Sequence, residues 1–261
     1  MKRFIQNVKR YWSYSIYAAK AELKAEVANS YLNWLWWILD PIAFMIVYTV
    51  LVQVVFGTKE EFFPVFVFVG LTCWNYFNVS VSGSVKLVSN NKAIVTKVYV
   101  PKYILVLVKS LKNLFKMMIS WVLVIVLMLI FKVPFHLTML YWILIMPVLF
   151  VVTFGISTIL LHFGIFVEDL FNITNIVLKL VFYLSGIFYS IGKRISSPIA
   201  KKLLLKVNPI AFIMDQCRNV MIYDKLPSFK WLAIWFVVGC LLSWIGITVI
   251  HKYENSYAKV I

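Results

Sequence analysis

Residues 30–41 read Ser-Tyr-Leu-Asn-Trp-Leu-Trp-Trp-Ile-Leu-Asp-Pro and open the first long apolar stretch of the chain. A leader precedes them, and it carries six lysine and arginine side chains. Tryptophans such as Trp34, Trp36 and Trp37 are typical of the boundary between membrane and water. The stretch therefore predicts the point at which a helix lying on the membrane surface turns into the bilayer.

The composition of the whole chain supports this interpretation. Of 261 residues, 62% are hydrophobic and only 14% are charged. Such a chain has more apolar surface than a soluble core of this size would bury, so we expect lipid to cover most of it. The apolar stretches are continuous, whereas membrane strands would alternate between apolar and polar residues. We therefore expect an all-α integral membrane protein.

The number of crossings follows from the apolar stretches, since each crossing needs about 20 mostly apolar residues in a helix. Six stretches meet this condition, at residues 34–56, 65–85, 104–131, 140–166, 173–189 and 229–250. We expect a single membrane domain over residues 1–261, with no cleavable signal. Its parts are an amphipathic interfacial helix at 1–31, spans one to five within 32–189, short amphipathic or re-entrant exoplasmic helices at 190–228, a sixth transmembrane helix at 229–250 and a tail at 251–261.

The distribution of basic residues predicts the orientation, because loops rich in lysine and arginine stay in the cytoplasm. The basic leader places the N-terminus inside, and an even number of spans then places the tail at 251–261 inside as well. The basic loop at 86–102 agrees. The segment 190–230 is also basic, although six spans place it outside. Five spans would remove this conflict, but only by dismissing one apolar stretch.

Motifs for chemistry are missing from the sequence. There is no Gly-x-x-x-x-Gly-Lys-Ser/Thr phosphate loop and no room for a nucleotide-binding domain, so ATP would have to be bound by a partner. The three cysteines and three histidines show no metal-ligand spacing. We interpret the paired acids at 60–61 and 168–169 as solvated loop charges. The sequence predicts no catalytic residue, no metal site, no cofactor in this chain and no nucleic-acid partner.

Three polar stripes lie within the spans at helical spacing. They are Asn75, Asn78 and Ser82; Lys109, Lys112 and Lys116; and Asn172, Asn175, Lys179 and Tyr183. One interpretation is hydrogen bonding between helices, with lysines reaching toward the lipid headgroups. The other is a polar path whose cytoplasmic end attracts an anionic substrate. Aromatic residues that could stack on sugar rings along such a path are Trp74, Tyr76, Phe77, Tyr183, Phe188 and Tyr189.

Several short motifs occur in a fixed order along almost the whole chain. After the basic leader and residues 30–41 come Val47-Tyr48, Val55-Phe56, Phe63 to Leu71, Asn90 to Pro101, Ser185 to Tyr189, Asn208 to Ala211, Arg218 and Lys252-Tyr253-Glu254. In this order they resemble the type-2 ABC exporter permeases of the polysaccharide, O-antigen and teichoic-acid branch. The chain departs from the family pattern at Asn33, which replaces Gly, at Glu168, which replaces Arg, and at Gly186, which replaces Pro.

The resemblance implies a transport subunit that is not itself an enzyme. It implies a homodimer with two copies of a separate ATPase, which binds Mg-ATP, in the cytoplasmic membrane of a bacterium. The cargo would be a polymer linked to polyprenyl pyrophosphate, either teichoic acid or an O-antigen-type polysaccharide. The coupling helix that contacts the ATPase would comprise Asn90, Asn91, Lys92, Ala93 and Ile94. We expect Ser89 or Asn90 to cap it.

The resemblance also implies that residues 191–224 form short helices on the exit side. We expect their basic side chains to guide an anionic polymer or to contact anionic lipid. These side chains are Lys193, Arg194, Lys201, Lys202 and Lys206. The excess of lysine over arginine is compatible with a Gram-positive teichoic-acid exporter.

Three other functions remain open. A type-2 exporter of a drug or small lipid would need a narrow apolar path in place of a wide aromatic one. An ion-coupled carrier would need carboxylates within the membrane, and only Asp40 qualifies. A membrane enzyme such as a polyprenyl-phosphate transferase would need clustered acids to hold metal and phosphate.

Overall fold

The computed structural model describes residues 2–28, 33–52, 60–194 and 196–260. Within these ranges the ordered elements are all helices and no strand occurs, which confirms the all-α prediction. Three residues of the opening motif, Ser30, Tyr31 and Leu32, lie outside the described residues, and so does the Val55-Phe56 pair.

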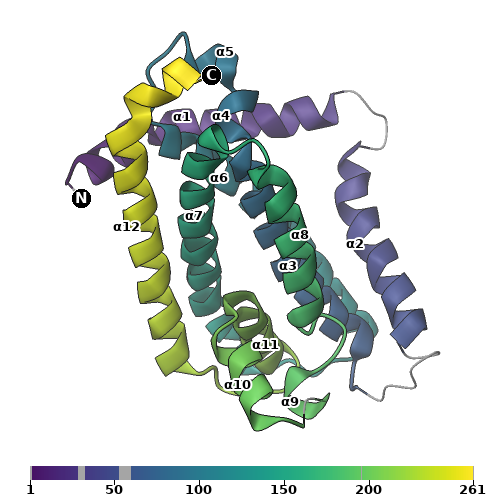
Figure 1. The fold of residues 1–261 in the computed structure, drawn as a ribbon. Helices are drawn as coiled ribbons and strands as arrows, with labels where there is room; N and C mark the ends of the chain where they lie inside the picture. Colours follow the sequence, from purple (N-terminus) through teal and green to yellow (C-terminus); the bar gives the residue numbers. More distant parts are fainter. Residues whose placement is uncertain (1, 29–32, 53–59, 195, 261) are drawn as a thin grey trace.

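Six apolar helices form a bundle at the six predicted places. They are α2 (Asn33–Val50), α3 (Phe63–Val85), α6 (Lys102–Ile130), α7 (Trp142–Phe166, preceded by the 3-10 helix η2 at Leu137–Tyr141), α8 (Leu170–Leu184) and α12 (Phe229–Val260). Most residues of α3 are buried, and the helix packs against α2, α6, α7, α8 and α11. Helices α7 and α12 lie side by side (Figure 1). A Cβ atom at Gly155 or Gly239 would collide with the facing helix, so these glycines permit the close approach.

Four of these helices are long and apolar enough to cross a membrane, at Phe63–Val85, Lys102–Ile130, Leu137–Phe166 and Phe229–Glu254. The other two apolar helices are shorter, at Trp34–Val50 and Leu170–Leu184. Since an α-helix rises about 1.5 Å per residue, α8 is roughly 22 Å long, compared with a hydrocarbon core of about 30 Å.

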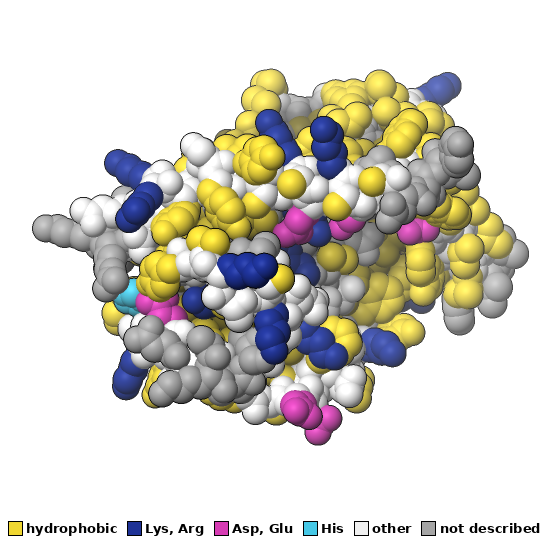
Figure 2. Space-filling model, turned by 90° about the horizontal axis from the view of Figure 1, so that it is seen from above, with side chains coloured by type: hydrophobic (Ala, Val, Ile, Leu, Met, Phe, Trp, Pro, Cys, Tyr) yellow, Lys and Arg dark blue, Asp and Glu magenta, His cyan; other side chains and the backbone are white. Residues whose placement is uncertain are grey.

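One end of the bundle carries α1 (Lys2–Val27), which lies across the helix ends and packs against α6 (Figure 1). The short helices α4 (Leu87–Asn90) and α5 (Lys92–Val95) lie at the same end, as does the C-terminus (Figure 1). Seen from this side, lysine and arginine side chains are spread over the face (Figure 2). The elements that the sequence predicts to be cytoplasmic therefore share one end of the molecule.

The opposite end is formed by α9 (Ile191–Arg194), α10 (Pro198–Lys206) and α11 (Pro209–Met221) (Figure 1). The predicted break at Asn208-Pro209 is confirmed, since the Asn208 side chain accepts hydrogen bonds from the Ile210 and Ala211 amides and caps α11. Helix α10 has no buried residue. Helix α11 does not lie on the surface, because most of its side chains, including Arg218, are buried against α3 and α7.

Candidate functional site

A cavity of about 730 Å³ lies among α2, α3, α6 and α8. Its wall combines aromatic rings, amide and hydroxyl groups, and three charged side chains. The lining residues are Trp36, Trp37, Asp40, Pro41, Phe44, Tyr48, Leu71, Thr72, Trp74, Asn75, Tyr76, Asn78, Val79, Asn113, Lys116, Met117, Ser120, Lys179, Phe182 and Tyr183. The volume is typical of a site that encloses a small molecule or a few linked rings.

Aromatic rings form a continuous line along one side of this cavity. Phe188, in the turn after α8, stacks on Tyr48 of α2 with 3.7 Å between ring centroids. It also contacts Phe182 at 5.4 Å, and Phe182 lies 5.3 Å from Trp74 of α3. Such ring contacts stabilise the approach of three elements and leave aromatic faces beside the cavity. Flat apolar faces of this kind can stack on sugar rings.

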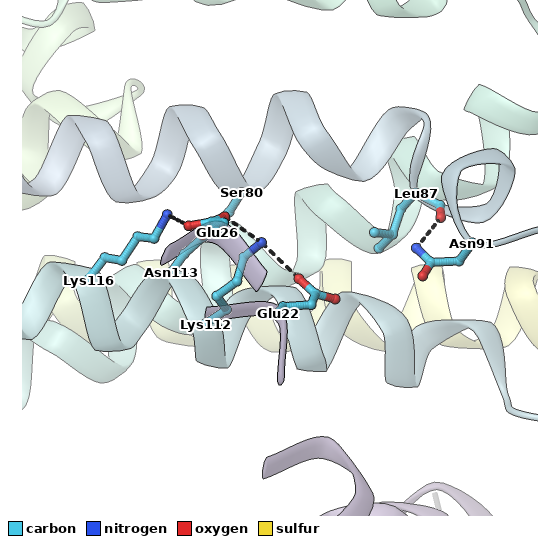
Figure 3. A network of polar contacts seen from close by, with 8 residues as sticks. All are labelled: Glu22, Glu26, Ser80, Leu87, Asn91, Lys112, Asn113 and Lys116. Carbon is cyan, nitrogen blue, oxygen red and sulfur yellow. Dashed lines mark hydrogen bonds and ion pairs between the residues drawn. The ribbon is translucent and has the colours of Figure 1, made fainter. Parts of the chain in front are cut away.

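Two buried polar groups line the same cavity without a hydrogen-bond partner among the described residues. They are the hydroxyl of Tyr76 and the amide oxygen of Asn113. The amide nitrogen of Asn113 donates to Ser80 Oγ at 2.9 Å (Figure 3), so only its oxygen is left over. Because an unpaired buried polar group is costly, this donor and this acceptor favour a ligand or water that carries hydroxyl groups.

Ion pairs join α1 to α6 next to the cavity (Figure 3). The Nζ atom of Lys112 lies 2.8 Å from Glu22 Oε2 and 3.0 Å from Glu26 Oε1, and Lys116 pairs with the other oxygen of Glu26. Burial raises the pKa of Glu26, but hydrogen bonds and positive charge from Lys116 and Lys112 outweigh it and hold the pKa below its ordinary value. Glu26 is therefore ionised at neutral pH.

These pairs add a contact that neither interpretation of the lysine stripe included. Lys112 and Lys116 both contact carboxylates of α1, and Lys116 also lines the cavity. The carboxylate of Glu26 points from α1 toward α6 (Figure 3). Lys109 lies against α3, at the place where a Cβ of Gly83 would stand.

The structure brings about half of the predicted path residues to the cavity wall. Those that line it are Trp74, Tyr76, Asn75, Asn78, Lys116, Lys179 and Tyr183. The predicted residues that do not line it are Phe77, Ser82, Lys109, Lys112, Asn172, Asn175, Phe188 and Tyr189. Among these, Phe188 and Phe77 contact lining rings, Ser82 donates to the Asn78 carbonyl, and Tyr189 donates to the Tyr183 carbonyl.

Sequence reasoning missed the contribution of α2. Trp36 and Trp37 were assigned to the membrane boundary, yet both line the cavity. Asp40, Phe44 and Tyr48 also line it, at intervals of four residues. That spacing places them on one face of a helix and was visible in the sequence. Asn113 and Phe182 also line the cavity and were missed. The position of Asn113 within an apolar span was a signal that could have identified it, because a polar side chain there tends to face the protein interior.

The predicted coupling segment consists of two short helical turns, α4 and α5, and not of one helix. The expected cap at Ser89 or Asn90 is wrong, because the side chain that contacts the backbone is that of Asn91, which donates to the Leu87 carbonyl at 2.8 Å (Figure 3). Asn90, Lys92 and Ala93 are exposed, while the side chain of Ile94 lies outside what the structure describes. The segment thus presents an exposed surface on the face that α1 and the C-terminus share.

The predicted exit-side basic residues have different surroundings. Lys201 Nζ donates to the Gly192 carbonyl at 2.6 Å, and Lys206 Nζ lies 5.0 Å from the centre of the Trp231 ring. Arg194 and Lys202 are exposed. The side chain of Lys193 is outside the described part of the structure. A second cavity, of about 260 Å³, opens beside them and is lined by Asp215, Arg218, Asn219 and Lys225 among others.

Comparison with known proteins places this geometry in a family. Residues 17–222 match the ABC-2 type transporter family. The chain is 27% identical to an O-antigen export system permease protein RfbA of Myxococcus xanthus, with 100% of both chains covered. It is 23% identical to proteins of the same name from Klebsiella pneumoniae, with 92% of each chain covered. These matches confirm the resemblance seen in the motifs, and the chain belongs to the ABC-2 type transporter family as a membrane-spanning permease subunit rather than a catalytic one.

Proposed function

We propose that this permease exports a lipid-linked cell-surface polymer, of the O-antigen or teichoic-acid type, carried on polyprenyl pyrophosphate. The observation that carries the proposal is the cavity among α2, α3, α6 and α8, which combines a line of aromatic rings with unpaired hydroxyl and amide groups. Sugars present both apolar ring faces and hydroxyl groups, so such a wall suits them. The printed names of the relatives, O-antigen export permeases, point the same way.

An exporter of a drug or small lipid is the second candidate. A pathway for such a cargo would be narrow and lined by aliphatic side chains. The cavity instead contains Asp40, Lys116 and Lys179 and two asparagines of α3, Asn75 and Asn78. This polar lining favours a hydroxylated or phosphate-bearing cargo.

We further propose six crossings, with α2 and α8 spanning alongside the four longer helices, and with both termini in the cytoplasm. In this arrangement α1 is the interfacial helix. Support comes from the placement of α1, α4, α5 and the C-terminus at one end of the bundle (Figure 1). The lysine and arginine side chains that are spread over that end are compatible with a cytoplasmic face (Figure 2).

The ATPase that an ABC-2 permease requires would dock on this face. We propose a homodimer of the permease with two ATPase copies, which bind Mg-ATP, and we place the contact at α4 and α5. The exposed side chains of Asn90, Lys92 and Ala93 would contact the ATPase surface.

On the exit side, Arg194 and Lys202 would contact an anionic polymer, and their replacement by Gln would then lower its export.

Co-purification with candidate ATPase subunits tests the proposal. The expected result is a complex of two permeases and two ATPases whose ATP hydrolysis falls when Lys92→Gln and Ala93→Asp are introduced together. Lys252→Gln is a matched control, since it removes the same charge from an exposed position on the same end. A folded permease that binds no ATPase would overturn the proposal and favour an ion-coupled carrier.

A further inference from the structure

The two carboxylates of α1 hold the α6 lysines in an arrangement that a phosphate group would match. Glu26 uses both of its oxygens, one on Lys112 and one on Lys116, and Glu22 supplies a further oxygen to Lys112 (Figure 3). Phosphate and pyrophosphate also present several anionic oxygens on one compact group. Lysine ammonium groups bind such groups as point charges.

The local charge favours a second anion. Three lysines of α6, Lys109, Lys112 and Lys116, lie where α6 meets α1 and α3, and we call this place the corner. Only two carboxylates, those of Glu22 and Glu26, balance their charge there. Lys109 forms no salt bridge with any residue that the structure describes. The pyrophosphate that joins lipid to polymer is esterified at both ends and carries about two negative charges, compared with one for a carboxylate. Such a group would therefore supply by itself the charge that Glu22 and Glu26 supply together.

The same corner opens onto the cavity. Lys116 is part of the cavity wall, and its Nζ atom lies 4.9 Å from the centre of the Trp37 ring. Its side chain is 28% exposed, and that of Lys112 is 14% exposed. Asn113 follows Lys112 directly in α6 and lies about one helical turn before Lys116. Its amide oxygen is unpaired among the described residues and can accept a hydrogen bond from a sugar hydroxyl. A ligand in the cavity can thus reach Lys116 without crossing the protein.

We propose that Lys112 and Lys116 are the binding site for the phosphate headgroup of the cargo lipid, and that Glu22 and Glu26 occupy this site until the headgroup displaces them. The inference rests on the proposed function, since it names the part of the cargo that this corner recognises. Displacement breaks the ion pairs that hold α1 to α6. Arrival of the headgroup is therefore coupled to release of the C-terminal half of α1 from the bundle.

The first test measures binding to the permease–ATPase complex in nanodiscs, using two probes, soluble inorganic pyrophosphate and a polyprenyl pyrophosphate mixed into the lipid. Replacement of both Lys112 and Lys116 by Gln is expected to weaken binding of the lipid probe about tenfold or more, because charge-assisted hydrogen bonds are lost. Replacement of both Glu22 and Glu26 by Gln is expected to tighten it, since the competing carboxylates are gone. Lys20→Gln with Lys24→Gln is the matched control for charge.

A purely structural role for the ion pairs predicts a different result, in which both double variants bind the probe equally or both bind it more weakly. Either result overturns the proposal. Binding of soluble pyrophosphate alone, with no response to the lipid probe, also overturns it. In each of these cases an intact complex that still hydrolyses ATP would leave the proposed function standing.

A second measurement leaves both carboxylates in place. Spin labels at Lys24→Cys and Phe115→Cys, two exposed positions on α1 and α6, report the distance between these helices. The polyprenyl pyrophosphate is expected to lengthen this distance, whereas the same lipid without its phosphates is not. An unchanged distance at a probe concentration that saturates binding would contradict the displacement.

Discussion

At the scale of single residues, Arg218 is held by several contacts at the end of the bundle that α9, α10 and α11 form. Its guanidinium donates to the carbonyl oxygens of Phe66, Gly186 and Ile187 at 3.1, 2.8 and 2.7 Å. It also lies 3.5 Å from the centre of the Phe66 ring, and only 4% of the residue is exposed. One buried charge thus ties α11 to α3 and to the turn after α8.

Arg218→Lys should destabilise the permease although it keeps the charge. A single ammonium group cannot reach three carbonyls as the planar guanidinium does, so at least two buried acceptors lose their donors. At about 1–3 kcal/mol for each lost donor, we expect a loss of roughly 2–6 kcal/mol. Thermal unfolding in detergent measures it. Arg194→Lys, the same change at an exposed site, should leave the midpoint unchanged, and an equal shift in both variants would contradict this account.

At the scale of elements, a hydrogen bond joins the last turns of α12 to the segment that follows α5. Tyr99 donates to Glu254 Oε1 at 2.8 Å, and His251 Nδ1 lies 3.1 Å from the same oxygen. Further along α12, Tyr257 is fully buried and its hydroxyl lies 2.7 Å from His162 Nδ1 of α7. Tyr99 follows α5 closely in the chain. A movement of α5 would therefore be transmitted to α12 through the Tyr99–Glu254 hydrogen bond, and from α12 to α7 through Tyr257 and His162.

Tyr99→Phe should therefore uncouple ATP hydrolysis from transport. The substitution removes one hydroxyl and one hydrogen bond, so we expect a stability loss of only about 1 kcal/mol. The amount of cargo moved for each ATP hydrolysed should fall severalfold, while hydrolysis itself continues. Tyr17→Phe, which removes a hydroxyl from an exposed side chain, is the control. A parallel fall in hydrolysis, transport and thermal stability would instead assign Tyr99 a structural role alone.

Sequence alone was sufficient for the elements but not for their contacts. The apolar stretches predicted all six bundle helices. A helix that is surrounded by lipid needs apolar residues along its whole length, so it appears in the sequence as one continuous apolar stretch. The Tyr48–Phe188 stack and the Glu26–Lys116 pair each join residues far apart in the chain. Contacts between residues so far apart leave no periodic pattern in the sequence from which they could be predicted. The burial of Arg218 in α11 likewise depends on three carbonyl partners that lie at least 31 residues away in the chain.

At the scale of the whole molecule, basic residues occur at both ends of the bundle, so net charge alone does not fix the orientation. The formal net charge is +16, and lysines lie on α1 and α5 at one end and on α10 at the other. The number of crossings decides whether α1 and α5 lie on the same side of the membrane. If only the four longer helices crossed, α1 and α5 would lie on opposite sides, although both lie at one end of the bundle (Figure 1). The shorter helices α2 and α8 are therefore the ones whose crossing has to be tested.

Labelling with a membrane-impermeant maleimide distinguishes these topologies. Six crossings predict that Ala93→Cys on α5 is labelled only after the cells are permeabilised, whereas Phe135→Cys, in the loop between α6 and α7, is labelled in intact cells. If α2 and α8 did not cross, the two results would be exchanged, because the loops on either side of α6 would change sides together. The parent chain is the control for its own cysteines, of which Cys73 and Cys217 are buried and Cys240 is exposed. Labelling of Ala93→Cys in intact cells would also remove α5 from reach of a cytoplasmic ATPase, so the coupling proposal depends on this result.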